Sequence, residues 1–87
     1  MPKLFELGQL VATPAVLSVC QAAGVKGSSL FLRHAAGDWG RADAEANKAG
    51  LDGSDMLISI HDVGGVEVWV LTEADRSVTT LHLPSER

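Results

Sequence analysis

The adjacent glycines Gly64 and Gly65 stand in the middle of a β-rich stretch, residues 56–72. Two consecutive residues that tolerate positive φ are typical of a two-residue hairpin turn. Pairing across this turn sets the register of both strands and places Ile60 opposite Trp69. One face of the hairpin, called the tryptophan face, then consists of Ile58, Ile60, Trp69 and Leu71. We expect the tryptophan face to pack against the core.

The opposite face of the hairpin, called the valine face, is apolar as well. It carries Leu57, Val63, Val66, Val68 and Val70. A sheet face of this kind is too apolar to be left in water. Either the N-terminal arm or a helix of the same chain covers it, or a partner does. The second alternative predicts a symmetric homodimer through Val66, Val68 and Val70.

A third strand is expected at residues 77–83, which are rich in threonine and valine and follow the polar turn 73–76. Together with the hairpin it completes an antiparallel meander. Residues 4–12, near the N-terminus, are expected to form an edge strand or an extended arm.

Helix signals lie in the N-terminal half. Thr13 followed by Pro14 is typical of an N-cap with proline at the first helical position, and it predicts a helix over 15–23 that ends at Gly24. Two shorter helices are expected at 30–36, capped by Ser28 or Ser29, and at 44–49, capped by Asp43. The sequence therefore predicts one α+β domain spanning 1–87. In it, two or three short N-terminal helices pack on a C-terminal three-stranded antiparallel β-meander.

The composition places the chain among ordinary globular domains: 87 residues, 46% hydrophobic and 21% charged. Its single cysteine, Cys20, cannot form an internal disulfide, which favours a reducing compartment. The longest stretch poor in charge, 7–24, falls short of the ~20 apolar residues that cross a bilayer, and no secretory signal pattern is visible. We expect a cytoplasmic protein without a membrane anchor.

Acidic residues dominate the middle of the chain. Residues 38–75 carry nine acids against two bases, a net charge of −7, whereas the whole chain has −4. Nucleic-acid binding requires clustered lysine and arginine, so direct binding of DNA or RNA is not expected. A protein partner with a basic surface is expected instead. The candidate partner-binding residues are Asp38, Trp39, Asp43, Glu45, Asp52 and Asp55.

Trp39 lies at the tip of a turn bracketed by Gly37 and Gly40. Asp38 can accept backbone N–H groups within this turn. The indole either buries over the sheet or is presented to a partner as an aromatic anchor. Both alternatives remain open from the sequence.

Catalysis is not expected. Glu73, Asp75 and Arg76 fall on a hairpin turn, whereas acid–base chemistry requires groups positioned in a cleft. Cys20 lies on the apolar face of its helix, where a thiol is inert. The three histidines lack the spacing of a metal site: His34, His61 and His82. No metal site is therefore expected. No cofactor is expected either, since Gly64-Gly65 has no following helix and cannot form a phosphate-binding loop.

Four segments carry a resemblance to a known family: residues 5–14 (FELGQLVATP), 34–40 (HAAGDWG), 69–80 (WVLTEADRSVTT) and 83–86 (LPSE). They resemble a family of short, largely uncharacterised bacterial proteins found on plasmids, integrative elements and phages. Members are sometimes labelled type I restriction methylase subunits. This chain lacks the glycine-rich cofactor loop and the catalytic run of such an enzyme, so the label does not describe an activity expected here.

The resemblance implies a protein carried by mobile elements, and the charge pattern adds an acidic surface. We expect a non-enzymatic binding protein that inhibits a host defence complex, of the CRISPR or restriction kind, by occupying a basic nucleic-acid site. The alternative is a dimeric structural or regulatory accessory protein of plasmid maintenance. Clustering of the acids on one surface favours the first hypothesis, and scatter favours the second.

Overall fold

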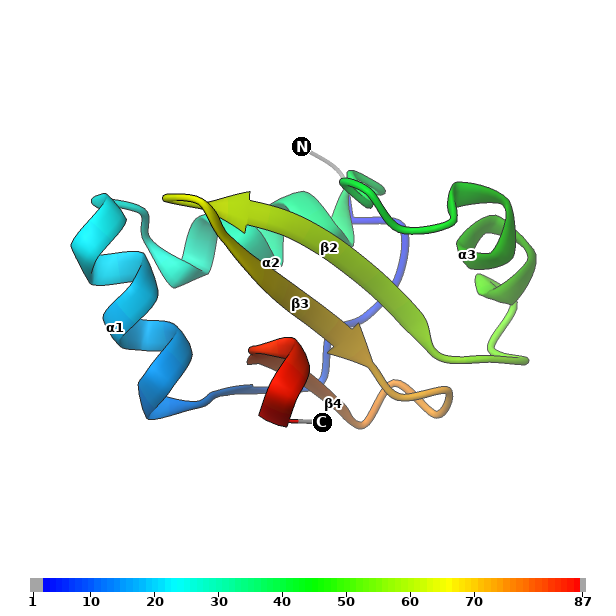
Figure 1. Cartoon of the computed structure of the whole chain (residues 1–87). Coiled ribbons are helices and arrows are strands. Elements are labelled where there is room, and N and C mark those ends of the chain that lie inside the picture. The colour runs from blue at the N-terminus through cyan, green and yellow to red at the C-terminus, as the bar shows by residue number, and fades with distance from the viewer. Residues whose placement is uncertain (1–2, 87) are drawn as a thin grey trace.

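The structure, a computed structural model, describes residues 3–86 and has an α+β fold. Its helices are α1 (Pro14–Ala23), α2 (Gly27–Ala35), α3 (Ala44–Gly50) and the short 3₁₀ helix η1 (Pro84–Glu86). Its strands are β1 (Gln9–Ala12), β2 (Leu57–Val63), β3 (Val66–Thr72) and β4 (Val78–His82). Figure 1 shows α1 at one end of the sheet, α2 behind the sheet and α3 at its other end.

The four strands form one mixed sheet in the order β1-β4-β3-β2. The antiparallel hairpin has the expected register, with Ile60 opposite Trp69. The expected antiparallel meander forms from β2, β3 and β4. The sheet as a whole is not three-stranded and not wholly antiparallel, because β1 adds a fourth strand parallel to β4. Gln9 N–H donates to Ser77 O at 3.0 Å, and Thr13 N–H donates to Leu81 O at 3.1 Å. Residues 9–12 are thus an edge strand, one of the two alternatives expected for this segment.

The chain reaches β1 through a close approach at Gly8. Its φ is +67°, and a Cβ there would lie 2.4 Å from the carbonyl oxygens of Arg76 and Ser77. Glycine alone fits this contact between the arm and the β3–β4 turn. The paired residues of β1 and β4 are 69 positions apart in sequence, which explains why strand periodicity did not identify this pairing.

Local capping signals predicted two of the three helices correctly. The Thr13 side chain accepts the N–H of Val16 at 3.2 Å, and α1 ends at Gly24 with φ +69°. The Asp43 side chain caps α3 by accepting the N–H groups of Glu45 and Ala46. The expected serine cap of α2 is wrong. This helix begins earlier, after Lys26 and without a side-chain cap.

The helices α1 and α2 cover the valine face. Val68 and Val70 are fully buried there against helix residues, the inner side chains of α1 and α2 being Val16, Cys20, Leu30 and Phe31. The chain therefore covers this face itself, one of the two alternatives stated above. Val66 remains 39% exposed, whereas Val68 and Val70, the other residues of the homodimer alternative, are fully buried.

The expectation that the tryptophan face is the core face is wrong. Ile58, Ile60 and Trp69 are only half-buried, although Leu71 is buried. The valine face also carries two polar residues, Ser59 and His61. Both are buried.

The outer edge of β2 is sealed by the segment that leads into α3. The Asn47 side chain donates to Ile58 O at 2.7 Å and accepts Ile58 N–H at 2.9 Å, as a neighbouring strand would. Trp39 O accepts Ile60 N–H, and Arg41 N–H donates to Ile60 O. The outward-facing backbone N–H and C=O groups of Ile58 and Ile60 thereby have hydrogen-bond partners, and α3 is held beside the strand.

Within residues 3–86, no single helix is long and apolar enough to cross a membrane. Only α1 and α2 taken together reach the length and composition of a span, and they meet at a bend of 100°.

Candidate functional site: a groove beside α3

Two of the four segments that carry the family resemblance, 34–40 and 69–80, meet inside the protein around His34. His34 is fully buried, and its Nδ1 and Nε2 atoms face the hydroxyls of Ser59 and Thr72. The Nε2–Thr72 Oγ1 distance is 2.9 Å. Thr72 contacts Thr79 Oγ1 at 2.7 Å, and Thr79 donates to Leu7 O at 2.6 Å. A chain of hydrogen bonds thus crosses the interior from β2 to the N-terminal arm.

The last bond in this chain sets the direction of the others. Since Thr79 gives its proton to Leu7 O, Thr72 donates to Thr79 and accepts from His34 Nε2–H. Nδ1 is then the acceptor for Ser59. This arrangement needs a neutral imidazole. Burial lowers the pKa of His34 from 6.5 to about 4, with the nearby His61 and Arg76 acting in the same direction.

The His34–Ser59 contact has the composition of a nucleophile and its base, but neither side chain is exposed to solvent. A substrate cannot reach it without unfolding part of the core. The polar chain therefore serves to align α2, β2, β3 and β4. The sequence did not reveal it because its members are far apart along the chain, and the available signal was polar residues at inward positions of three strands, Ser59, Thr72 and Thr79.

Trp39 belongs to the same interior. Its ring stacks on Phe5 with centroids 5.9 Å apart and meets the edge of His34 at 5.5 Å. Only 9% of Trp39 is exposed, so the ring is not presented to a partner and the buried alternative holds. Asp38 remains at the surface, where it pairs with Arg33 at 2.8 Å and accepts Gly40 N–H at 3.2 Å. The Arg33 hydrogen bond lowers the pKa of Asp38.

Arg76 is occupied by main-chain contacts. Its guanidinium donates to four carbonyl oxygens, those of Gly50, Asp55, Glu73 and Ala74, at 2.6–3.1 Å. It also lies 5.7 Å from the centre of the Phe5 ring. Asp75 accepts the N–H and hydroxyl of Ser77 within the turn. Arg76 therefore ties the β3–β4 turn to the loop after α3, and its donors are not free to clamp an anion.

The remaining chemistry-bearing residues do not form a site. Cys20 is buried, and burial raises the pKa of its thiol. Burial also lowers the pKa of His61, whose Nε2 is a buried side-chain atom without a hydrogen-bond partner in the described part of the chain. Among residues 3–86, no group of three or more histidine, cysteine, aspartate or glutamate side chains is placed to hold a metal ion.

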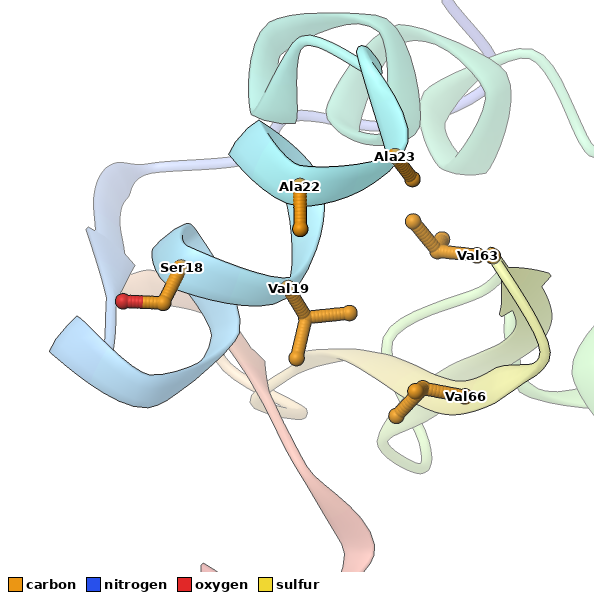
Figure 2. A pocket seen from close by; sticks show the side chains of 7 residues that line it. Ser18, Val19, Ala22, Ala23, Val63 and Val66 are labelled. Atoms are coloured by element: carbon orange, nitrogen blue, oxygen red, sulfur yellow. The ribbon is translucent and has the colours of Figure 1, made fainter.

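Two of the surface hollows offer little chemistry. Figure 2 shows the one between α1 and the tip of the β2–β3 hairpin, of about 320 Å³, with Val19, Ala22 and Ala23 facing Val63 and Val66. No charged side chain lines it. Another, of about 260 Å³, lies beside two cations already paired with acids, Lys3 with Glu6 and Arg33 with Asp38.

A third hollow, the α3 groove, lies between α3 and the tryptophan face and has a volume of about 440 Å³. Its apolar lining comes from α3 and the tryptophan face and from the residues just before α3 and β2: Ala42, Ala46, Met56, Ile58, Ile60 and Trp69. Three charged residues stand at its rim: Arg41, Asp43 and Asp55. The groove exists because the helices α1 and α2 occupy the opposite face of the sheet, which leaves the isoleucines and Trp69 half-exposed.

The cation at the rim is neutralised by its neighbours. Arg41 Nη2 lies 3.1 Å from Asp62 Oδ1 and 2.8 Å from Glu67 Oε1. The other oxygen of Glu67 accepts the indole N–H of Trp69 at 2.8 Å. This sequence of contacts fixes the Trp69 ring within the groove. Arg41 together with its two acids contributes a net negative charge.

Two of the six candidate residues, Asp43 and Asp55, line this groove. Asp43 and Glu45 lie at the start of α3, and Asp52 and Asp55 lie in the loop that follows it. All four are exposed. Backbone groups hold three of the carboxylates: Asp43 accepts from Glu45 and Ala46, Asp52 accepts from Ser54, and Asp55 accepts from Met56. Asp43 and Asp55 therefore stand at the groove, whereas Trp39 is not part of it.

In comparisons with known proteins, no protein-family model, no curated protein and no solved structure matches the chain.

Proposed function

We propose that this chain is a non-enzymatic binding protein that presents an acidic surface, centred on the α3 groove, to a protein with a basic surface. The observation that carries the proposal is that Asp43 and Asp55 line the apolar α3 groove and that Glu45 and Asp52, close to them in sequence, are exposed as well. Backbone hydrogen bonds hold Asp43, Asp52 and Asp55 in place, and all four carboxylates remain accessible to a partner.

The charge of this region supports a cationic partner. Six carboxylates, including Asp62 and Glu67, stand against Arg41 and Lys48, which leaves a net charge of −4. Such a field raises the rate of encounter with a basic surface and is screened by salt over about 10 Å at 0.1 M. The apolar lining of the groove adds a contact from which water is excluded, and this contact slows dissociation of the complex.

The proposal extends to the setting that the family resemblance implies. In a protein carried by a mobile element, an acidic surface can occupy the nucleic-acid site of a host defence complex, of the CRISPR or restriction kind. Support comes from the resemblance and from the anionic surface. A dimeric accessory role in plasmid maintenance is the weaker hypothesis, because its dimer surface was the valine face, which α1 and α2 cover.

The non-enzymatic part of the proposal rests on access. The one histidine–serine pair, His34 with Ser59, has no exposed atoms to offer a substrate. Arg76 gives its donors to carbonyl oxygens of its own chain.

The test separates folding from binding at the same residues. In the neutralised variant, Asp43, Asp52 and Asp55 become Asn and Glu45 becomes Gln. Asparagine caps a helix about as well as aspartate, and exposed charges contribute only ~0 to 1 kcal/mol each, so the melting temperature should change little. Capture of a basic protein from host lysate should fall about tenfold or more at low salt. Added nucleic acid should compete with the wild-type protein for that partner.

A matched control loses the same four charges elsewhere: Glu6→Gln, Glu73→Gln, Asp75→Asn and Glu86→Gln. None of these residues lines the α3 groove. The control should capture the partner nearly as well as the wild type. Equal losses in both variants would mean that total charge matters rather than this surface, and undiminished capture by the neutralised variant would refute the proposal.

A further inference from the structure

The α3 groove has the size of a small binding pocket. Ligand pockets typically measure about 300–1,000 Å³, and this groove, at about 440 Å³, lies at the lower end of that range. It has room for one long side chain and its neighbouring backbone. Two small residues, Ala46 on α3 and Ala42 just before this helix, leave that space open opposite Trp69.

Two carboxylates at the rim have an oxygen to spare. Asp43 Oδ1 accepts two backbone N–H groups, and Asp55 Oδ1 accepts that of Met56. These bonds hold both side chains in place and leave each Oδ2 without a hydrogen-bond partner within residues 3–86. Arg41, the cation of the rim, is already paired with Asp62 and Glu67. The unmet electrostatic requirement of the groove is therefore positive charge.

Because this requirement accompanies the apolar walls and an indole, we infer that the α3 groove seats an arginine side chain of the partner protein. The inference rests on the proposed function and names the chemistry that the groove selects. A guanidinium is planar and weakly hydrated, stacks on aromatic rings, and offers five N–H donors in a fixed fork. Lysine ends in a compact, strongly hydrated ammonium, which loses more hydration beside Ile58, Ile60 and Trp69.

The α3 groove is preorganised to bind a cation stacked on Trp69. Glu67 Oε2 holds the Trp69 indole N–H at 2.8 Å, and Glu67 Oε1 is held in turn by Arg41 at 2.8 Å. The indole therefore keeps its orientation before a partner arrives, which reduces the entropy lost on binding. The arginine stem lies along the isoleucines, and its head lies between Asp43 and Asp55.

The two tryptophans provide the measurement. Each gives one indole N–H signal in a nitrogen–proton spectrum, and Trp39, in the interior, serves as the internal reference for Trp69. The probes are blocked tetrapeptides of arginine, lysine and citrulline; citrulline keeps the shape of arginine without its charge. The arginine peptide should shift the Trp69 signal and leave the Trp39 signal in place. The lysine peptide should bind about tenfold more weakly or worse, and the citrulline peptide should not bind.

Two variants locate the peptide. Ala46→Leu fills the groove without changing a charge, and its control, Ala44→Leu, alters an exposed α3 residue that does not line the groove. Asp43→Asn with Asp55→Asn removes both rim charges, and Glu6→Gln with Glu73→Gln removes two charges elsewhere. The first member of each pair should weaken arginine-peptide binding at least about tenfold, and the control should not. Equal affinity for arginine and lysine, or an unmoved Trp69 signal, would overturn the inference.

Failure of this inference can be told apart from failure of the proposed function. If Ala46→Leu still captures the basic partner from lysate while the four-site neutralised variant does not, the acidic surface stands and the arginine seat is wrong. If neither variant changes capture, the proposed function itself is wrong.

Discussion

The two faces of the sheet are about equally apolar in sequence but differ in what lies against them. The valine face is buried under α1 and α2, with Val68, Val70 and Leu81 fully enclosed. It also encloses polar side chains, and these are bonded to one another through His34. The tryptophan face keeps Ile58, Ile60 and Trp69 half-exposed beside the α3 groove.

This difference shows that apolarity alone does not select the core face. A polar residue at an inward position costs little when another part of the chain supplies its hydrogen bond, as His34 does for Ser59 and Thr72. A large aromatic residue at an outward position is tolerated when it has a polar neighbour, as Trp69 has in Glu67. The following experiments measure the contrast between the two faces.

The largest effect is expected from truncation on the valine face. Leu81 is fully buried in the main apolar cluster, so Leu81→Ala removes packed methyl groups and leaves a cavity. The free energy of unfolding should fall by about 2–5 kcal/mol. Denaturant unfolding monitored by circular dichroism measures this loss. A loss below about 1 kcal/mol would place the core elsewhere.

The buried polar chain should make the valine face sensitive to acid. Unfolded His34 takes up a proton near its ordinary pKa of 6.5, whereas folded His34 does so only near 4. Its contribution is therefore complete above pH 6.5 and is lost as the pH falls toward 4, by about 3 kcal/mol. The lowered pKa values of Asp38, Asp52 and Asp75 act in the same direction, but only below their ordinary value of 3.8.

Titration of the His34 ring signals by NMR checks this prediction directly. A pKa near 4 is expected, and a pKa of 6.5 or above would contradict a neutral, enclosed imidazole. His34→Gln removes the titrating group, so the unfolding free energy of that variant should depend less on pH between 6.5 and 4 than that of the wild type.

The smallest effect is expected on the tryptophan face. Trp69 is half-buried, so Trp69→Ala should lower the free energy of unfolding by only about 1–2 kcal/mol, less than Leu81→Ala despite the larger side chain. The same denaturant series compares the two variants. A greater loss for Trp69→Ala would reverse the assignment of the two faces.

Features governed by neighbouring residues could be predicted from the sequence. The Gly64-Gly65 turn set the register of β2 and β3, and Thr13 and Asp43 marked the starts of α1 and α3. The pairing of β1 with β4 and the choice of core face could not be predicted in this way. Both depend on contacts between segments far apart in sequence, such as Leu7 with Thr79.

The candidate site also combines features that neighbouring residues determine with features that depend on distant contacts. Exposure of Asp43, Glu45, Asp52 and Asp55 followed from turns and a short helix, which leave side chains in water. The apolar half of the α3 groove escaped prediction because Ile58, Ile60 and Trp69 had been assigned to the interior. Trp39 was retained as a possible surface residue because its partner Phe5 lies 34 positions earlier in the chain.

The amide of Asn47 also limits how copies of this protein can join. A sheet lengthens from copy to copy only if each copy has two accessible edges, as in cross-β fibres. Here Asn47 and the Trp39–Arg41 segment occupy the edge at β2, and β1 is the edge that remains. Joining two copies through β1 would use up both remaining edges. Strand addition therefore ends at a pair, so the Asn47 amide and the Trp39–Arg41 segment together protect the chain against polymerisation.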